Sequence, residues 1–173
     1  MSVVRISVTG TESTGKTTLC EALAKQYGIE HVPDISRDYI AKLKKPYVYQ
    51  DVLNIADGII EAEDKALRKA DKLLLSDNDL INIKIWLQYY KWQVPTWLTH
   101  AIEARKYDFY LLCNIDLPWE ADAQRANPND RKALFDKFQQ ELKYLDAKYF
   151  LISGNTDKRL QNAVNQIGFL IRK

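Results

Sequence analysis

The stretch Gly10-Thr11-Glu12-Ser13-Thr14-Gly15-Lys16-Thr17 fits the pattern G-x-x-x-x-G-K-[ST]. It follows an apolar, β-branched run at residues 3–8, which predicts a buried strand, and it precedes residues 16–27, whose apolar positions have helical spacing. A glycine-rich turn between a strand and a helix directs successive backbone N–H groups into one concavity, where they bind phosphate oxygens. The alternative is an ordinary glycine-rich turn, which would not require a strand before it and a helix after it. The sequence therefore predicts a loop that binds a nucleoside triphosphate.

The residue types of this loop suit separate tasks. The glycines leave space where a Cβ would obstruct the turn, and the N–H groups of residues 12–17 face the phosphates. Lys16 reaches the β- and γ-phosphates as a point charge, and the Thr17 hydroxyl is a ligand for Mg²⁺. We therefore expect ATP and Mg²⁺ as cofactors. The residues expected to bind the nucleotide are Gly10, Glu12, Ser13, Thr14, Gly15, Lys16, Thr17 and Thr18.

Strand-like and helix-like segments alternate along the rest of the chain. Further short apolar runs predict strands at 29–32, 72–76, 109–113 and 149–152. Helical spacing predicts helices near 36–43, 51–70, 80–90, 95–105, 130–145 and 160–171. This alternation predicts one α/β domain over residues 1–173, a three-layer α/β/α fold with a mostly parallel, five-stranded sheet. The polar stretch at about 117–131 is expected to form a lid.

The composition limits the partners that we expect. A net charge of +2 is too small to favour nucleic acid or an anionic membrane as the main partner. No apolar run approaches the length of a membrane span, and the first ten residues lack a leader pattern. Cys20 and Cys113 are expected to be small buried hydrophobes in a reducing compartment. We expect a cytoplasmic protein, and the sequence leaves its oligomeric state open.

Two carboxylates follow the predicted strand at 72–76. Ligands in parallel sheets bind at the carboxyl ends of the strands, so Asp77 lies where it could act on the nucleotide. If the γ-phosphate is transferred to a hydroxyl group of a second molecule, the acceptor, Asp77 is a candidate for the Mg²⁺ shell or for accepting the proton of that hydroxyl. Asp79 is a candidate for holding acceptor hydroxyls. The alternative is a polar turn in which Asp79 caps the next helix.

Other candidates lie in polar segments after strands. Arg125 and Arg131 lie in the expected lid, where they would stabilise charge on the transferred phosphoryl group. Trp119, in the same segment, would stack on a flat heteroaromatic acceptor. Arg37 is either a clamp on the acceptor or phosphate, or part of a surface ion pair. We expect the loop with Gly154 and Asn155 to pack against the adenine base, although a simple turn explains the glycine equally well.

With these residues identified, the chain resembles the ribosylnicotinamide kinase domain of NadR-like proteins, within a wider AAA group of P-loop ATPases. The resemblance rests on the phosphate loop, on Arg37-Asp38-Tyr39, on Asp77-Asn78-Asp79 and above all on Pro118-Trp119-Glu120-Ala121-Asp122 with Arg125 and Asp130-Arg131-Lys132. It implies ATP-dependent phosphorylation of the 5′-hydroxyl of nicotinamide riboside. It also implies that Trp119 holds the nicotinamide ring and that Asp122 binds substrate. The family has Asp-Thr-Asp where this chain has Asp77-Asn78-Asp79, and a Glu where this chain has Asp34.

We therefore expect an ATP- and Mg²⁺-dependent kinase with a small nucleoside acceptor, nicotinamide riboside first among them. Two alternatives remain open. One is a kinase for another nucleoside or a nucleotide. The other is a nucleotide-dependent ATPase or switch without a small-molecule acceptor.

Overall fold

A computed structural model describes residues 3–121 and 129–171. Within these residues the sheet has four strands, β1 (Val4–Thr9), β2 (Leu73–Asp77), β3 (Phe109–Cys113) and β4 (Tyr149–Ile152). They lie in the order β2-β1-β3-β4 and every neighbouring pair is parallel. The parallel α/β sheet that the sequence predicts is thus confirmed, and β1 is central in it, so the loop that follows β1 lies in the middle of the sheet edge.

The predicted fifth strand at 29–32 is wrong. Only Val32 pairs with the sheet, as an isolated bridge to Ser76. The N–H of Ile29 donates to the carbonyl of Ala24, so the start of the predicted strand closes the end of the preceding helix. Pro33 follows directly and has no N–H to donate to a sheet ladder. Too few residues remain between these two constraints to form a strand.

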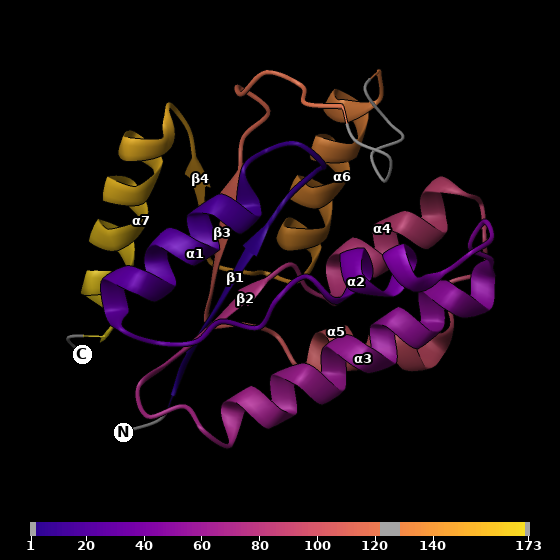
Figure 1. The fold of residues 1–173 in the computed structure, drawn as a ribbon, viewed down its shortest axis with the longest axis horizontal. Helices are drawn as coiled ribbons and strands as arrows, with labels where there is room; N and C mark the ends of the chain where they lie inside the picture. The colour runs from indigo at the N-terminus through magenta and orange to yellow at the C-terminus, as the bar shows by residue number, and fades with distance from the viewer. Residues whose placement is uncertain (1–2, 122–128, 172–173) are drawn as a thin grey trace.

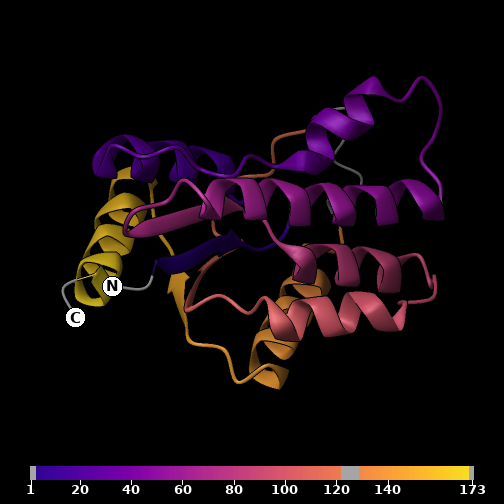
Figure 2. The same cartoon turned by 90° about the horizontal axis from the view of Figure 1, so that it is seen from below.

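Helices cover both faces of the sheet (Figure 1, Figure 2). On one face α1 (Lys16–Tyr27) packs against α7 (Thr156–Ile171). The other face is covered by four helices, α3 (Tyr49–Leu67), α4 (Leu80–Tyr89), α5 (Thr96–Ala104) and α6 (Arg131–Tyr144). The short helix α2 (Ile35–Lys42) packs on α3. Both faces are buried, as a parallel sheet requires.

The strands send alternate residues into two separate apolar cores. Leu73 and Leu75 join the core under α1 and α7, whereas Leu74 joins the core under α3 to α6. This alternation follows from the two-residue period of a strand. Cys20 and Cys113 are buried and free, as expected of small hydrophobic residues. In the described part of the chain no helix combines the length and apolar character needed to cross a membrane.

Candidate nucleotide and acceptor site

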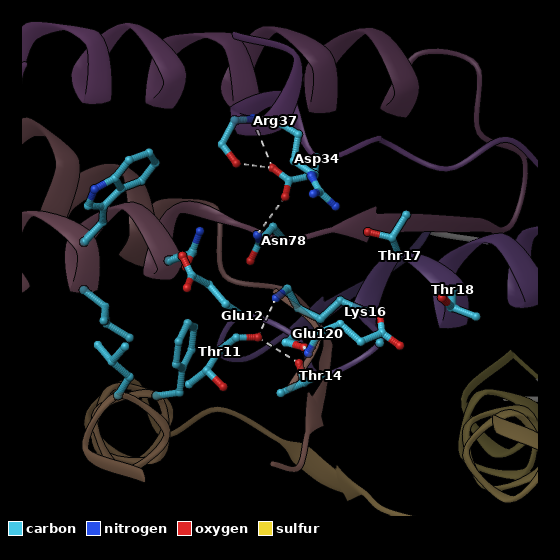
Figure 3. A pocket seen from close by; sticks show the side chains of 18 of the residues that line it. Thr11, Glu12, Thr14, Lys16, Thr17, Thr18, Asp34, Arg37, Asn78 and Glu120 are labelled. Atoms are coloured by element: carbon cyan, nitrogen blue, oxygen red, sulfur yellow. Dashed lines mark hydrogen bonds between the residues drawn. The ribbon is translucent and has the colours of Figure 1, made fainter. Parts of the chain in front are cut away.

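A cavity of about 790 Å³ opens at the carboxyl ends of the strands and continues between the helices on one side (Figure 3). Its first part is formed by the phosphate loop and the start of α1. Its second part lies among α2, α4 and α6. The lining residues used below are Thr11, Glu12, Ser13, Thr14, Gly15, Lys16, Thr17, Thr18, Asp34, Arg37, Lys45, Tyr47, Asn78, Trp86, Tyr89, Tyr90, Thr156, Arg159 and Leu160. A single space thus joins the loop to a second, more apolar compartment.

The phosphate loop has the backbone conformation that its glycines allow. Gly10 has φ 133°, and a Cβ there would lie 3.0 Å from the carbonyl oxygen of Cys113, so only glycine fits against the neighbouring strand. Gly15 has φ 75° immediately before α1. Gly10 shapes the loop from below and does not line the cavity, whereas residues 11–18 do. The N-terminus of α1 therefore opens toward the space where phosphates would lie.

Lys16 lies within the loop that it serves. Its Nζ donates to the carbonyl of Thr11 at 2.8 Å, and the Thr14 hydroxyl donates to the same carbonyl at 2.8 Å (Figure 3). The ammonium group is therefore held at the edge of the cradle by one backbone oxygen. An incoming anion can replace that oxygen with little movement of the side chain, because Lys16 lines the cavity already.

Asp77 is a buried carboxylate at the end of β2. It is 2% exposed, and neither of its oxygens has a hydrogen-bond partner within the described residues. Burial raises the pKa of Asp77, while the nearby Thr17 hydroxyl and Lys16 ammonium favour the charged form. A buried polar group without a partner calls for an explanation such as an ion or water. Thr17 and Asp77, the two predicted metal ligands, thus lie beside each other.

Asp34 and Asn78 form a polar pair between the two compartments. Asp34 caps α2 by accepting from the N–H of Ser36 at 3.0 Å, and its other oxygen accepts from Asn78 at 3.5 Å (Figure 3). Asn78 has φ 78°, a left-handed conformation that asparagine tolerates better than most residues. Both side chains line the cavity. The sequence analysis gave neither residue a role, although an asparagine after a strand was a usable signal for such a turn.

The structure corrects the role expected for Asp79. It is 2% exposed and does not line the cavity. One carboxylate oxygen accepts from the Ser7 hydroxyl at 2.5 Å, and the other accepts from the N–H of Ile81 at 2.8 Å. Asp79 is the N-cap of α4, which was the alternative interpretation of the sequence. Because it is buried and does not line the cavity, Asp79 has no access to acceptor hydroxyls in this arrangement.

Four aromatic side chains line the second compartment, and we call this the aromatic bay: Tyr47, Trp86, Tyr89 and Tyr90. Tyr47 packs edge-on against Trp86, and its hydroxyl donates to that of Tyr90 at 2.7 Å. Tyr47 lies on the loop between α2 and α3, and the other three aromatics lie on or next to α4. Nothing in the sequence singles out Tyr47, whereas Trp86, Tyr89 and Tyr90 were open between facing the acceptor cleft and packing in the core. Helical aromatics usually belong to the core, and only the fold shows which of them face a cavity.

Cations and carboxylates share the rim of the cavity. Arg37, predicted as a clamp, lines it from the exposed side of α2, and Lys45 lines it from the following loop. Glu12 lies in the phosphate loop and also faces this space. The rim therefore offers both signs of charge to a ligand. Lys45 has no counterpart among the sequence predictions.

The segment after β3 is fastened to the phosphate loop. The guanidinium of Arg131 donates to the carbonyls of Leu117 and Ser13, both at 3.1 Å, and lies over the Trp119 ring at 5.7 Å from its centroid. Neither Arg131 nor Trp119 lines the cavity, so the expected stacking of Trp119 on an acceptor is not found here. The ring faces an arginine instead, a favourable cation–π arrangement. Asp122 and Arg125 lie outside the described residues.

The loop after β4 also differs from expectation. The N–H of Gly154 donates to a carboxylate oxygen of Asp116 at 2.7 Å, and the Asn155 side chain accepts from the N–H of Lys158 at 3.0 Å. Both residues shape the turn into α7 and neither lines the cavity. Their neighbours Thr156 and Leu160 do line it. If a base packs here, it contacts these α7 side chains, because the polar groups of Gly154 and Asn155 are used within the turn.

Comparison with known proteins agrees with this geometry. Residues 5–159 match the AAA domain family. The chain is 26% identical over 144 residues to the trifunctional NAD biosynthesis/regulator protein NadR of Salmonella typhimurium strain LT2. That match covers 80% of this chain and 35% of NadR, so the chain spans about a third of the length of this relative.

Two solved structures share the fold. A NadR protein in complex with NR has a TM-score of 0.77 at 16% identity, covering 98% of this chain and 51% of that one. Thymidylate kinase from Ehrlichia chaffeensis has a TM-score of 0.68 at 13% identity, covering 96% and 100%. The parallel sheet flanked by helices is thus that of P-loop kinases, and the resemblance to NadR-like proteins is confirmed. The chain belongs to the AAA domain family of P-loop proteins.

Proposed function

We propose that this protein is an ATP- and Mg²⁺-dependent kinase for a small nucleoside, with nicotinamide riboside as the leading acceptor. The observation that carries the proposal is the continuous cavity, in which a phosphate loop, a polar pair and an aromatic bay follow one another. A kinase needs these three parts in this order, because the γ-phosphate must meet an acceptor hydroxyl while the rest of the acceptor is held away from the triphosphate.

The donor end binds the triphosphate through backbone N–H groups of the loop and through Lys16. As charge shifts toward the leaving oxygen and the transferred phosphoryl group, the Lys16 ammonium and the N-terminus of α1 stabilise it. Arg131 holds the segment after β3 against Ser13 and so keeps one wall of the loop in place. We retain Arg125 as a proposed source of positive charge from the lid.

Thr17 and Asp77 fit a Mg²⁺ ion that arrives with the nucleotide. The fit rests on the two carboxylate oxygens of Asp77 that have no partner within the described residues and on the adjacent Thr17 hydroxyl. In the described part of the chain no three His, Cys, Asp or Glu residues cluster as metal ligands. Mg²⁺ commonly uses one or two protein ligands together with phosphate oxygens and water. When bound, the ion would neutralise phosphate charge.

Asp34 is the carboxylate best placed to receive the acceptor proton. It lines the cavity between the loop and the aromatic bay, whereas Asp77 is buried and does not. In the proposed step the acceptor oxygen forms a bond to the γ-phosphorus, and the bond from that phosphorus to the β,γ-bridging oxygen breaks. ADP leaves with the bond electrons, and the hydroxyl proton moves to Asp34.

Nicotinamide riboside suits the bay for a chemical reason. Its flat, positively charged ring would pack among Tyr47, Trp86, Tyr89 and Tyr90, and cations are attracted to aromatic faces. The similar NadR protein has been solved with NR, and the curated relative is a NAD biosynthesis protein. These likenesses support the choice of acceptor.

A nucleotide acceptor is the second candidate, and Arg37 with Lys45 is the observation that favours it. These two cations line the same cavity and would suit a phosphate group on the acceptor. The fold is also similar to that of a thymidylate kinase. In this case the acceptor phosphate would lie toward α2, with the base in the aromatic bay.

ADP release from the purified protein with Mg²⁺-ATP tests both candidates. The panel contains nicotinamide riboside, adenosine, thymidine, thymidine monophosphate and a sample without acceptor. We expect the largest stimulation of ADP release with nicotinamide riboside, accompanied by nicotinamide mononucleotide. Stimulation by the monophosphate alone would replace the leading acceptor with the second. ATP binding and slow hydrolysis that no acceptor changes would identify a nucleotide-dependent switch.

A further inference from the structure

One arginine of α7 is almost fully enclosed beneath the phosphate loop. Arg159 is 2% exposed. Its Nη1 donates to the carbonyl of Thr14 at 2.8 Å, and its Nε donates to the carbonyl of Gly154 at 2.7 Å. Its Nη2 donates to the carbonyl of Asn114 at 3.1 Å and to the carboxylate of Asp116. One guanidinium group therefore joins the segments that follow β1, β3 and β4.

Asp116 fixes the direction of this guanidinium. A buried arginine is costly unless its charge and its N–H groups are satisfied, and here a carboxylate and three carbonyl oxygens satisfy them. The second oxygen of Asp116 accepts from the N–H of Gly154 at 2.7 Å, which holds the carboxylate in turn. The Arg159 side chain is thus held rigidly, unlike a mobile surface cation. We call the Arg159–Asp116 pair and its hydrogen bonds to the three backbone carbonyls the bracket.

The bond to Thr14 has a consequence for the next residue. In a trans peptide the C=O of one residue and the N–H of the following residue point in opposite directions. The bracket holds the Thr14 carbonyl toward Arg159, so the N–H of Gly15 must point the other way. Gly15 lines the cavity. Its positive φ of 75° is also a conformation that a loose loop would exchange easily, since glycine has many alternatives.

We propose that Arg159, oriented by Asp116, is a positioning residue that sets the direction of the phosphate-binding amides before the nucleotide arrives. The inference rests on the proposed function, because it requires a triphosphate at the loop. Binding to a preset loop avoids the cost of ordering it, so the bracket strengthens binding of the phosphate chain. Arg159 acts through the Gly15 amide and need not touch the ligand.

This role differs from two simpler ones. Arg159 also lines the cavity, so direct contact with the base is one alternative. A base contact would affect adenosine as strongly as ATP. A purely structural role would lower thermal stability and leave the affinity of the folded protein unchanged. A positioning role concentrates the loss on ligands with several phosphates. It also predicts that Asp116→Asn weakens their binding, whereas simple attraction to the Arg159 charge predicts that removing this carboxylate strengthens it.

Titrations of the full chain with three ligands separate these roles. ATP and inorganic triphosphate are followed by calorimetry, and the weaker adenosine by nuclear magnetic resonance. For Arg159→Met we expect at least about tenfold weaker binding of ATP and triphosphate, the size of a lost charged hydrogen bond, with adenosine changed by less than about twofold. Arg159→Lys should recover part of the loss, because it restores the charge without the fork. The matched control Lys158→Met, an exposed neighbour on α7, should bind all three ligands as the unaltered protein does.

If Arg159→Met does not fold, Asp116→Asn tests the positioning role instead. This variant should fold, because the Asp116 side chain is 32% exposed and asparagine has the same shape as aspartate. It should show the same selective loss at smaller size. ATP affinity unchanged in folded variants would overturn the proposal, as would equal losses for adenosine and ATP. If the unaltered protein binds neither ATP nor triphosphate, the proposed function fails, which is a different result.

Discussion

The two compartments of the cavity are built from different parts of the polypeptide. The donor end is a continuous backbone loop, whose carbonyls at Thr11, Ser13 and Thr14 are each held by a side-chain donor. The aromatic bay consists of side chains that come from a loop and a helix, with Tyr47 and Trp86 far apart in the sequence. Backbone N–H groups recognise the phosphates alone, whereas the side chains of the aromatic bay recognise the shape and charge of the acceptor. Substitutions at the two ends should therefore produce separable defects.

The largest effect is expected at the donor end, from Lys16→Ala. Losing the ammonium beside the transferred phosphoryl group should lower kcat by about 10²- to 10³-fold, comparable with the loss of a main electrostatic stabiliser. Steady-state ADP release with the best acceptor measures this. The matched control is Lys25→Ala, an exposed lysine on the same helix, which should retain full activity. An active Lys16→Ala variant would remove the basis for the donor end.

The next effect lies at the boundary of the two compartments. Asp34→Asn should lower kcat by about 10²-fold or more, because asparagine cannot take the acceptor proton. Asparagine caps helices as well as aspartate, so α2 should remain intact. Steady-state rate measurements check this. A lower kcat together with a KM for ATP within about twofold of that of the unaltered protein would support this role. A normal kcat would show that the proton goes elsewhere and would return Asp77 to consideration as the base.

A third substitution should affect the acceptor end alone. Tyr47→Ala removes one wall of the aromatic bay and should raise the KM for the acceptor by about tenfold, the usual worth of an aromatic contact, with the KM for ATP unchanged. The control Tyr144→Ala truncates a tyrosine that is 70% exposed, outside the cavity. Equal changes in both KM values would mean that the two compartments are not separable.

The smallest effect concerns stability and pH. Burial raises the pKa of Asp77, so the ionised carboxylate disfavours folding, and stability falls as the pH rises through that folded-state pKa. Asp77→Asn should therefore stabilise the nucleotide-free protein by about 1 kcal/mol at pH 7 while lowering activity. Urea unfolding should show this gain shrinking as the pH falls through the raised pKa of Asp77 and the carboxylate takes up a proton. The exposed Asp57→Asn should show no such gain.

Much of the fold was predictable because its signals are local. The alternation of strand-like and helix-like patterns predicts the parallel sheet and the helices on its two faces. One contiguous motif predicts the phosphate loop. The fifth strand failed where two local constraints compete, since Ile29 closes α1 and Pro33 interrupts the ladder. No short-range pattern reveals that conflict before the end of α1 is placed.

The site was predictable only where one segment contains it. Lys16 and Thr17 follow from the motif, and Asp77 from the end of a strand. Asp79 was misjudged because a cap and a ligand have the same sequence signature, and only the Ser7 contact across the sheet distinguishes them. Tyr47 and Arg159 depend on contacts between distant segments. A pattern read along the chain cannot supply such contacts.

The position of Tyr47 has a consequence for how such an enzyme can change. Lys45 and Tyr47 lie on a connection between α2 and α3, outside the sheet and on a different segment from the phosphate loop. Exchanging this short connection would give a new acceptor compartment while the sheet and the phosphate cradle stay as they are. Acceptor preference could then drift through a few surface residues, with no loss of the phosphoryl-transfer machinery along the way.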